Sequence, residues 1–299
     1  MSPFPLIRAM RPHQWVKNIF VLAALAFGEA QAPGLVLRAA YAFGAFCLAA
    51  SAVYLLNDVV DVEKDRAHPE KRHRPIAAGE LSIPVALVAC LVCALGGLFM
   101  ARLAGFVENG EAWHVTVVLG CYMLLNLAYS LRLKRVVLLD AFCIAGGFLF
   151  RVKAGALAVG VIVSPWLFLC TLFLSLFLAL CKRRAESDLL GEERGAHRRI
   201  LEDYTPAFLD QMVTLLAACT IIGYSMYTVS AQGEDTFGPE NRLFWTVPFV
   251  VFGLGRYLLL VQTRQGGGSP TRVLLGGDLT FLGNGVAWLV AILWLRMQA

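Results

Sequence analysis

Long apolar stretches separated by short polar ones are the dominant pattern along this chain. A membrane-spanning helix needs about 20 predominantly apolar residues, or about 17 at the short end. Stretches of this kind are centred near residues 24, 47, 92, 122, 147, 170, 218, 252 and 285. The pattern predicts an all-α polytopic membrane protein with nine transmembrane helices, forming a single transmembrane domain over residues 1–299.

The first of these stretches is the weakest. Only residues 19–27 are unbroken, so Lys17 and Asn18 are expected at the membrane interface. A cleavable signal peptide is the alternative, but the basic residues before the stretch are spread out and residues 28–30 make a poor cleavage site. We therefore count it as a span.

Composition supports a membrane protein. Hydrophobic residues make up 58% of the chain and charged residues 16%, with a mean hydropathy of +0.66, which is too apolar for a soluble globular protein. All eight cysteines lie in or beside apolar stretches. The pair Cys90 and Cys93 has no histidine or second pair nearby, so it is interpreted as packing rather than as a metal site.

Basic residues predict the orientation, because Lys and Arg favour the cytoplasmic side. They gather in the loops after the second, fourth and sixth spans. These residues are Lys64, Arg66, Lys71, Arg72 and Arg74; Arg132, Lys134 and Arg135; and Lys182, Arg183, Arg184, Arg194, Arg198 and Arg199. We expect a multi-pass protein of the plasma (inner) membrane, with the N-terminus and these loops in the cytoplasm. The net charge of +5 then suits membrane lipid headgroups and phosphate substrates, and not nucleic acid.

Acidic residues follow the second apolar stretch at helical spacing. Asn57, Asp61 and Asp65 are four residues apart and Asp58 is three before Asp61, so in a helix all four share one face. Carboxylate oxygens are the ligands that Mg²⁺ prefers, commonly together with substrate phosphates. We interpret the four as metal ligands, with the three aspartates as catalytic residues.

A solvated helix end whose acids pair with Lys64 and Arg66 is the alternative to this metal site. Two observations oppose it: acids at the end of a span are costly unless they are used, and bases follow closely. Lys71, Arg72 and Arg74 are expected to bind the phosphates of a metal-bound substrate.

Further charged residues stand in or beside the other apolar stretches. Lys182, Arg183 and Glu186 follow the sixth span, where anchoring by positive charge is the alternative. Asp140 begins an apolar stretch and is either a site residue or a structural partner of Lys134 or Arg135. Arg151 could pair within the bundle, extend to the interface or meet a lipid phosphate. Lys17, with Gln14 and Asn18, is either an interfacial anchor or part of a polar helix face.

The two longest charged loops, residues 58–82 and 182–206, each follow an even-numbered span. This placement indicates a loose internal repeat, with two related helical halves facing a shared cavity.

Several motifs resemble the UbiA superfamily of intramembrane prenyltransferases. They are the acidic motif from Asn57 to Asp65, the Tyr129-x-x-x-x-Lys134 element and a charged loop after the sixth span. The longer string from Ser51 to Gly79, with Arg11-Pro-x-Gln-Trp, Lys182-Arg183-x-Ala-Glu186 and Ile200-Leu-x-x-Tyr204-Thr, is similar to the decaprenyl-phosphate phosphoribosyltransferase branch.

The resemblance implies nine helices in a UbiA-like bundle around a cytoplasm-facing cavity, which binds phosphoribosyl pyrophosphate through Mg²⁺ and a polyprenyl phosphate through a lateral opening. It also implies site roles for Lys134 in catalysis and for Tyr129 and Tyr204 in substrate binding. One departure matters, since aromatic prenyltransferases of the superfamily carry a second DxxxD motif where this chain has Lys182-Arg183-Arg184-Ala-Glu186. Bases in place of acids favour a donor with an additional phosphate.

The expected reaction is transfer of 5-phosphoribose to a polyprenyl (decaprenyl) phosphate with release of pyrophosphate, as a step toward a lipid-linked arabinose donor for a cell-wall polysaccharide. Lys134, Lys182 and Arg183 are candidates for the sugar 5-phosphate or the lipid phosphate. The alternatives are an aromatic-acceptor prenyltransferase that uses a polyprenyl diphosphate and, from another class, a transporter of anionic lipids or sugar phosphates. The sequence leaves open whether the chain forms a homo-oligomer.

Overall fold

The computed structural model describes residues 4–27, 34–69, 71–105, 113–190, 203–238, 240, 242–263 and 278–298. These residues form helices joined by turns and short links, with no strand among them. The expected all-helical fold class is confirmed. Arg194, Arg198 and Arg199, which contributed to the expected orientation, lie outside the described residues.

Eight helical segments of the described part are long and apolar enough to cross a membrane. The helices are α3 (Leu35–Val60), α5 (Ile83–Ala104), α6 (His114–Leu131), α7 (Leu139–Val159), α8 (Pro165–Leu190), α11 (Pro206–Thr228), α13 (Val247–Thr263), which η5 (Arg242–Thr246) precedes, and α15 (Leu279–Gln298). They coincide with eight of the nine predicted spans, and the multi-pass character of the chain is therefore as expected.

The first predicted span is not a single helix. The 3₁₀ helix η1 (Pro12–Leu22) and the short α2 (Ala23–Phe27) cover its described part, and α1 (Phe4–Met10) precedes them. Arg11 separates α1 from η1 because its backbone is left-handed, with φ of 55°, and Pro12 has no amide hydrogen to donate. The expectation of a ninth continuous helix is corrected accordingly.

The helices fall into two compact units, each made of separate stretches of the chain. The first contains Met1–Leu25, Ala30–Leu131 and Phe150–Val161, and the second contains Ala26–Glu29, Arg132–Leu149 and Ile162–Ala299. Helix α7 therefore contributes residues to both. The single domain and the internal repeat expected from the sequence remain predictions.

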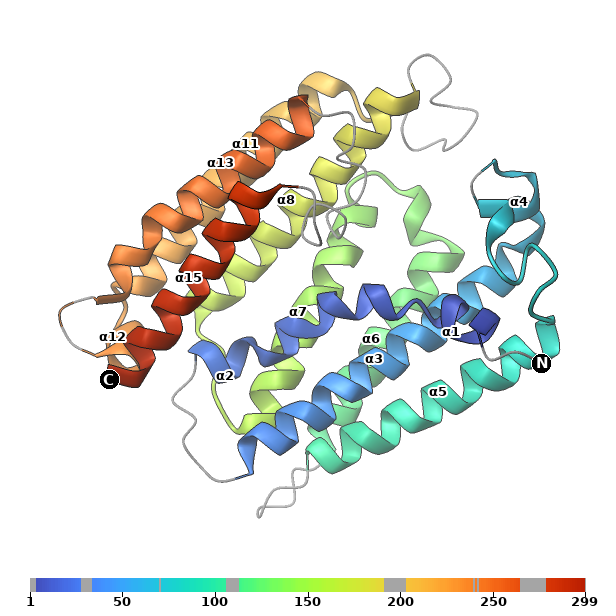
Figure 1. The fold of residues 1–299 in the computed structure, drawn as a ribbon, viewed down its shortest axis with the longest axis horizontal. Helices are drawn as coiled ribbons and strands as arrows, with labels where there is room; N and C mark the ends of the chain where they lie inside the picture. Colours follow the sequence, from blue (N-terminus) through green and yellow to red (C-terminus); the bar gives the residue numbers. More distant parts are fainter. Residues whose placement is uncertain are drawn as a thin grey trace. The chain divides into compact units, whose positions relative to one another are not determined.

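Small residues bring the helices of the first unit close together. Helices α3 and α5 run side by side (Figure 1). A β-carbon added at Gly97 of α5 would lie 3.1 Å from the Ala45 carbonyl oxygen of α3, so small residues allow this approach. Similarly, a β-carbon at Gly155 of α7 would overlap the carbonyl oxygen of Val21, and η1 therefore rests directly on α7.

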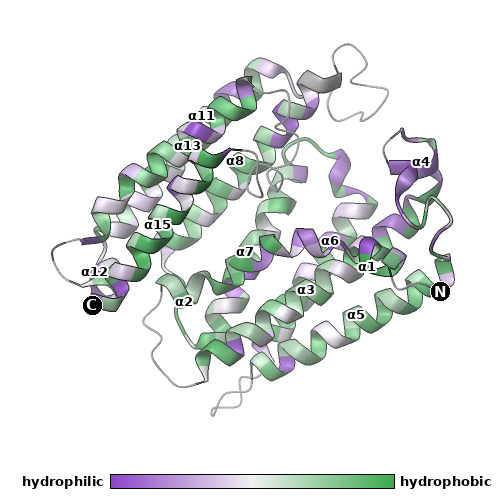
Figure 2. Cartoon of the chain, in the orientation of Figure 1, coloured by the Kyte–Doolittle hydropathy of each residue, from purple (hydrophilic) through white to green (hydrophobic). Residues whose placement is uncertain are grey.

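The connection between α3 and α5 carries the charged motif of the first unit. It contains α4 (Val62–Ala67) and the short η2 (Lys71–His73). Figure 2 shows hydrophilic residues gathered at α4, whereas α3 and α5 are mostly hydrophobic. The acidic motif thus lies at the junction between the apolar helix α3 and the polar link that contains α4 and η2.

The core of the second unit lies between α8 and α11, with α13 beside them. Phe177 and Leu180 of α8 are buried against Leu209 of α11 and Tyr257 of α13. The shorter elements of this unit are η3 (Leu133–Arg135) and α12 (Ala231–Phe237).

Candidate functional site

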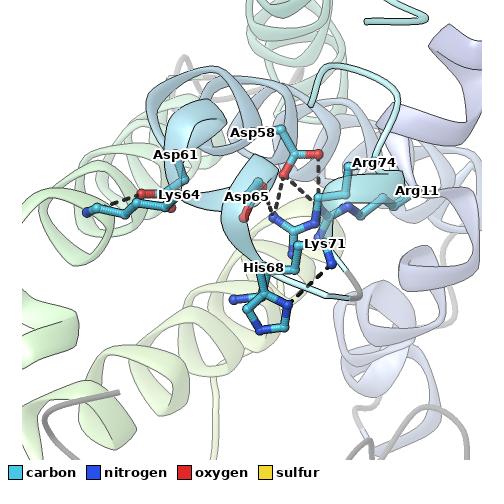
Figure 3. A network of polar contacts seen from close by, with 8 residues as sticks. All are labelled: Arg11, Asp58, Asp61, Lys64, Asp65, His68, Lys71 and Arg74. Carbon is cyan, nitrogen blue, oxygen red and sulfur yellow. Dashed lines mark hydrogen bonds and ion pairs between the residues drawn. The ribbon is translucent and has the colours of Figure 1, made fainter. Parts of the chain in front are cut away.

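Two of the predicted acidic residues converge in the first unit. Asp58 lies in the last turn of α3 and Asp65 in α4, and both are almost fully buried. Nη1 of Arg74 donates to Asp58 Oδ1 at 3.1 Å and to Asp65 Oδ2 at 2.6 Å. Nη2 of Arg11 donates to both oxygens of Asp58, at 2.6 and 2.9 Å. Figure 3 shows the two guanidinium groups gathered around these carboxylates.

The network is balanced in charge, because two carboxylates face two guanidinium groups. Buried carboxylates require such partners, since removing an unpaired charge from water is costly. The Arg11 guanidinium also lies over the ring of Tyr54, 4.9 Å from its centroid, which adds a cation–π contact. The arginine side chains remain partly exposed, 22% for Arg11 and 28% for Arg74, so a ligand could approach them from solvent.

The expected common face of four polar residues is only partly formed. The helix is not continuous through the motif, because α3 ends at Val60 and α4 begins at Val62, which leaves Asp61 between them. Asp61 accordingly turns aside to Lys64, at 3.9 Å (Figure 3). Asn57 lines a mainly apolar cavity of about 190 Å³ together with Asn126.

The remaining donor set fits Mg²⁺ bound together with a substrate diphosphate. Magnesium is commonly held by one or two protein carboxylates, with water and substrate phosphates in its other positions. Asp58 and Asp65 supply two carboxylates that already face one point, the Nη1 atom of Arg74. In the described part of the chain, no three Asp, Glu, His or Cys side chains are grouped so that they could hold a metal ion. A site built from protein ligands alone is therefore not present there.

The other bases of this loop remain at the surface. Lys71 and Arg72 lie in η2 and are exposed. The backbone amide of Lys71 contacts Nδ1 of His68 at 3.4 Å, and Arg72 Nε lies 3.3 Å from Nε2 of His73. Of the three predicted phosphate ligands in this loop, Arg74 belongs to the acidic cluster, whereas Lys71 and Arg72 are exposed.

A second polar cluster of the first unit surrounds Arg151 of α7. Its Nε donates to Asn18 Oδ1 at 2.7 Å and its Nη2 to the Tyr122 hydroxyl at 3.0 Å. The guanidinium also lies 4.8 Å from the ring centroid of Tyr122 and 5.7 Å from that of Phe46. Arg151 is thus held within the bundle, as one of the three sequence interpretations expected.

Lys17 lies beside this cluster, in η1 and outside the eight long apolar segments. Burial, together with the positive charges of Arg151 and Arg11, lowers the pKa of Lys17 to about 8. The predicted site residue Lys17 is therefore a positive charge close to two others, those of Arg151 and Arg11.

The second unit contains a different carboxylate network. Arg183 Nε donates to Asp140 Oδ2 at 2.7 Å, and Arg183 Nη1 to Glu186 at 2.8 Å. The Tyr204 hydroxyl donates to Asp140 Oδ1 at 2.8 Å and accepts from the amide of Leu138 at 2.7 Å. Burial and the bond to Asp140 raise the pKa of Tyr204, so its hydroxyl stays protonated. The ion-pair partner of Asp140 is Arg183, not Lys134 or Arg135.

The remaining predicted residues are half-buried near the ends of long helices. Tyr129 lies in the last turn of α6 in the first unit, whereas Lys134 in η3 and Lys182 on α8 belong to the second. Lys182 Nζ lies 3.7 Å from Glu186. Their roles in substrate binding remain predictions.

Sequence reasoning missed the roles of Arg11 and Tyr122. Arg11 precedes the first apolar stretch and reads as a simple membrane anchor, yet it contacts Asp58, 47 residues away. Tyr122 stands inside an apolar stretch and reads as packing. No spacing signal links either residue to its partner, although the positions of Arg11 and Asn18 on either side of Lys17 could have raised interest in this segment.

Comparison with known proteins identifies the family to which this fold belongs. Residues 18–275 match the UbiA prenyltransferase family. The chain belongs to this family. A UbiA homolog from Archaeoglobus fulgidus, whose structure is described as bound to GPP and Mg²⁺, has the same fold, with a TM-score of 0.70, 18% identity and coverage of 98% of this chain and 99% of that one.

Curated members of the UbiA family are similar over nearly the whole chain. A decaprenyl-phosphate phosphoribosyltransferase from Corynebacterium glutamicum is 38% identical, covering 96% of this chain and 85% of that protein. One from Mycolicibacterium smegmatis is 34% identical, covering 90% and 86%. The resemblance drawn from the motifs is confirmed, both for the family and for the branch.

Proposed function

We propose that this chain transfers 5-phosphoribose from phosphoribosyl pyrophosphate to a polyprenyl phosphate and releases pyrophosphate. The observation that carries the proposal is the cluster of Asp58 and Asp65 with Arg11 and Arg74 at the end of α3. Two carboxylates suit a divalent ion on the donor's diphosphate, and two guanidinium groups suit its oxygens. The named activity of the relatives supports the same reaction.

Asp58 and Asp65 would hold Mg²⁺, which supplies charge neutralisation for the departing diphosphate. Arg11 and Arg74 orient the carboxylates and bind phosphate oxygens through charge-assisted hydrogen bonds. The predicted metal roles of Asn57 and Asp61 remain predictions, since Asn57 lines the neighbouring cavity and Asp61 pairs with Lys64. Each of the four assigned side chains acts on the donor, and none needs to move a proton.

The chemical step is a displacement at the anomeric carbon. An oxygen of the polyprenyl phosphate forms the new C–O bond while the bond to pyrophosphate breaks, and its electron pair leaves with pyrophosphate. The attacking oxygen is already anionic at neutral pH, so no general base is required, and inversion at that carbon is expected. Catalysis then consists of positioning and electrostatic stabilisation of the leaving group.

The finer assignments belong to the same proposal. We place the reaction at the cytoplasmic face of the plasma membrane, because the bases of the described loops gather after α3, α6 and α8. The lipid is a decaprenyl-type phosphate, as the relatives' names imply for those proteins. Lys134, Tyr129 and Lys182 remain candidates for the sugar or lipid phosphate, and the product would feed a lipid-linked arabinose donor for cell-wall polysaccharide.

An aromatic prenyltransferase is the main competing function. That reaction uses a prenyl diphosphate and, in the superfamily members resembled here, a second acidic motif. The corresponding position has Lys182 and Arg183, and the carboxylate nearest to them on α8, Glu186, is engaged with Arg183 at 2.8 Å. In the described part of this region, bases therefore stand at the positions where the second acidic motif would supply metal ligands.

An assay with purified protein tests the proposed function. Radiolabelled phosphoribosyl pyrophosphate with polyprenyl phosphate and Mg²⁺ should give a labelled lipid and free pyrophosphate, whereas a prenyl diphosphate with an aromatic acid should give no product. Asp65→Asn should lower the rate by about 100-fold or more, as removal of an electrostatic group at a transition state does. The matched control is Glu63→Gln, which changes an exposed acid on the same short helix. Prenylation of the aromatic acid would contradict the proposal.

A further inference from the structure

The cationic surroundings of Lys17 are not accounted for by the metal and diphosphate cluster. Lys17 is half-buried in η1, next to Asn18, which is fully buried and bonded to Arg151. In the described part of the chain, Lys17 forms no ion pair with a carboxylate. A half-buried amine in such surroundings is costly unless an anion joins it.

The neighbouring cations differ in how they are used. Arg11 is committed to Asp58, through two hydrogen bonds from one nitrogen. Arg151 is held in a fixed orientation by Asn18, by the Tyr122 hydroxyl and by two aromatic rings. A fixed guanidinium beside a flexible amine is a combination that suits a phosphate, because the guanidinium sets direction and the amine adapts.

The position of η1 on α7 is also fixed. Val21 lies directly against Gly155, where no side chain would fit, and Trp15 Nε1 donates to Ser51 Oγ of α3 at 3.1 Å. Contacts on both sides of Lys17 therefore hold its backbone in place between α3 and α7. The charge of Lys17 is presented at a defined point rather than on a mobile segment.

We infer that Lys17, with Arg151 beside it, forms a subsite for a phosphate monoester, separate from the carboxylate cluster that takes the diphosphate. A phosphate monoester carries an average charge of about −1.5 to −2 at neutral pH. Two cations neutralise this charge. A diphosphate with its metal would instead be drawn to carboxylates, whereas the side chains bonded to Arg151, Asn18 and Tyr122, are both neutral.

The inference rests on the proposed function only for the identity of the monoester. Two sources fit that function: the head of the polyprenyl phosphate and the 5-phosphate of the ribosyl donor. Both carry the same chemical group, so binding must be compared for the two separately.

Binding measurements that need no catalysis can test the subsite. Isothermal titration of the purified full-length protein would use farnesyl phosphate as the lipid probe and ribose 5-phosphate as the sugar probe. Lys17→Met should weaken one of them by about tenfold or more, the loss typical of a hydrogen bond to a charged group. Lys17→Arg should retain binding to within a few-fold, because the charge remains.

The matched control is Lys153→Met, which removes an exposed base from the same helix as Arg151. Loss of farnesyl phosphate binding assigns the lipid phosphate to the subsite, and loss of ribose 5-phosphate binding assigns the sugar phosphate. If Lys17→Met binds both probes as Lys153→Met does, or if neither probe binds the wild-type protein, the inference is overturned. A wild-type protein that binds a probe through Lys17 but transfers no phosphoribose would instead contradict the proposed function alone.

Discussion

The acidic cluster of the first unit and the Asp140 network of the second use the same chemical groups in opposite ways. In the first, Arg74 is 28% exposed and bridges two carboxylates. In the second, the Arg183 side chain is 2% exposed and Asp140 is fully buried. Partners that retain contact with solvent can exchange a carboxylate for a ligand, whereas a closed network fixes the ends of helices. From this difference we predict that the first cluster binds substrate and that the second is structural.

The largest effect is expected from Arg183→Met. Removing one partner of a buried pair leaves an uncompensated carboxylate, which typically costs about 3–5 kcal/mol of stability. Thermal unfolding in detergent should show a marked fall in Tm. Arg184→Met is the matched control, because Arg184 pairs with a half-exposed Asp210, and such pairs contribute about 0–1 kcal/mol. Equal losses in the two variants would contradict a structural role for Arg183.

Arg74→Met should change ligand binding rather than stability. Its guanidinium occupies the point where both carboxylates converge, so its removal should tighten binding of Mn²⁺ in the absence of substrate, by about tenfold if one charge-assisted hydrogen bond competes. Binding of phosphoribosyl pyrophosphate should weaken in the same variant. Paramagnetic resonance of Mn²⁺ and titration of the donor measure the two effects. Weaker Mn²⁺ binding in this variant would mean that Arg74 supports the two carboxylates structurally, as Arg183 is expected to support Asp140. The proposed difference between the two regions would then be wrong.

Tyr204→Phe tests the network of the second unit by removing one hydroxyl, and the expected loss of stability is smaller than for Arg183→Met. The hydroxyl bonds both Asp140 and the amide of Leu138, a residue with a left-handed backbone at φ of 64°. Loss of a buried hydrogen-bonding group should cost about 1–3 kcal/mol. We expect a moderate fall in Tm with KM for both substrates unchanged. A specific rise in KM for one substrate would instead support the role in substrate binding that the sequence suggested for Tyr204.

The smallest effect is a pH dependence that belongs to the first unit. The pKa of Lys17 is lowered to about 8 by burial and by Arg151 and Arg11, so its charge is present at pH 7 and is lost as the pH rises through 8. Phosphate monoesters keep their charge over this range. Affinity for the phosphate probe should therefore fall several-fold between pH 7 and 9, a loss that Lys17→Arg should remove. The same fall in Lys17→Arg would assign the effect to another group.

Much of the fold could be predicted because apolar length alone defines a membrane helix. Eight predicted spans coincide with α3, α5, α6, α7, α8, α11, η5 with α13, and α15. The first span could not be predicted in detail, since hydropathy does not register that this stretch changes from the 3₁₀ helix η1, which ends at Leu22, to the short helix α2, which begins at Ala23. Hydropathy therefore located the segments but not their internal geometry.

The site was predictable where spacing decides it. Asp58 and Asp65, which the sequence placed on one helix face, do meet, although α3 ends at Val60 and Asp65 belongs to the separate helix α4. Asp61 stands between the two helices and pairs with Lys64 instead. Partners distant in sequence were not predictable. Asp140 lies near Lys134 and Arg135 in the chain, yet its partner Arg183 comes from another helix, 43 residues away. Such contacts depend on how helices pack, which local patterns do not encode.

The absence of a side chain at residue 155 has a consequence for inherited variation. Even alanine there would push against the carbonyl oxygen of Val21 and force η1 away from α7. Lys17 and Asn18, only four and three positions before Val21, would be carried along. A single methyl group on α7 would thus displace the polar residues of η1, although no charged residue is substituted.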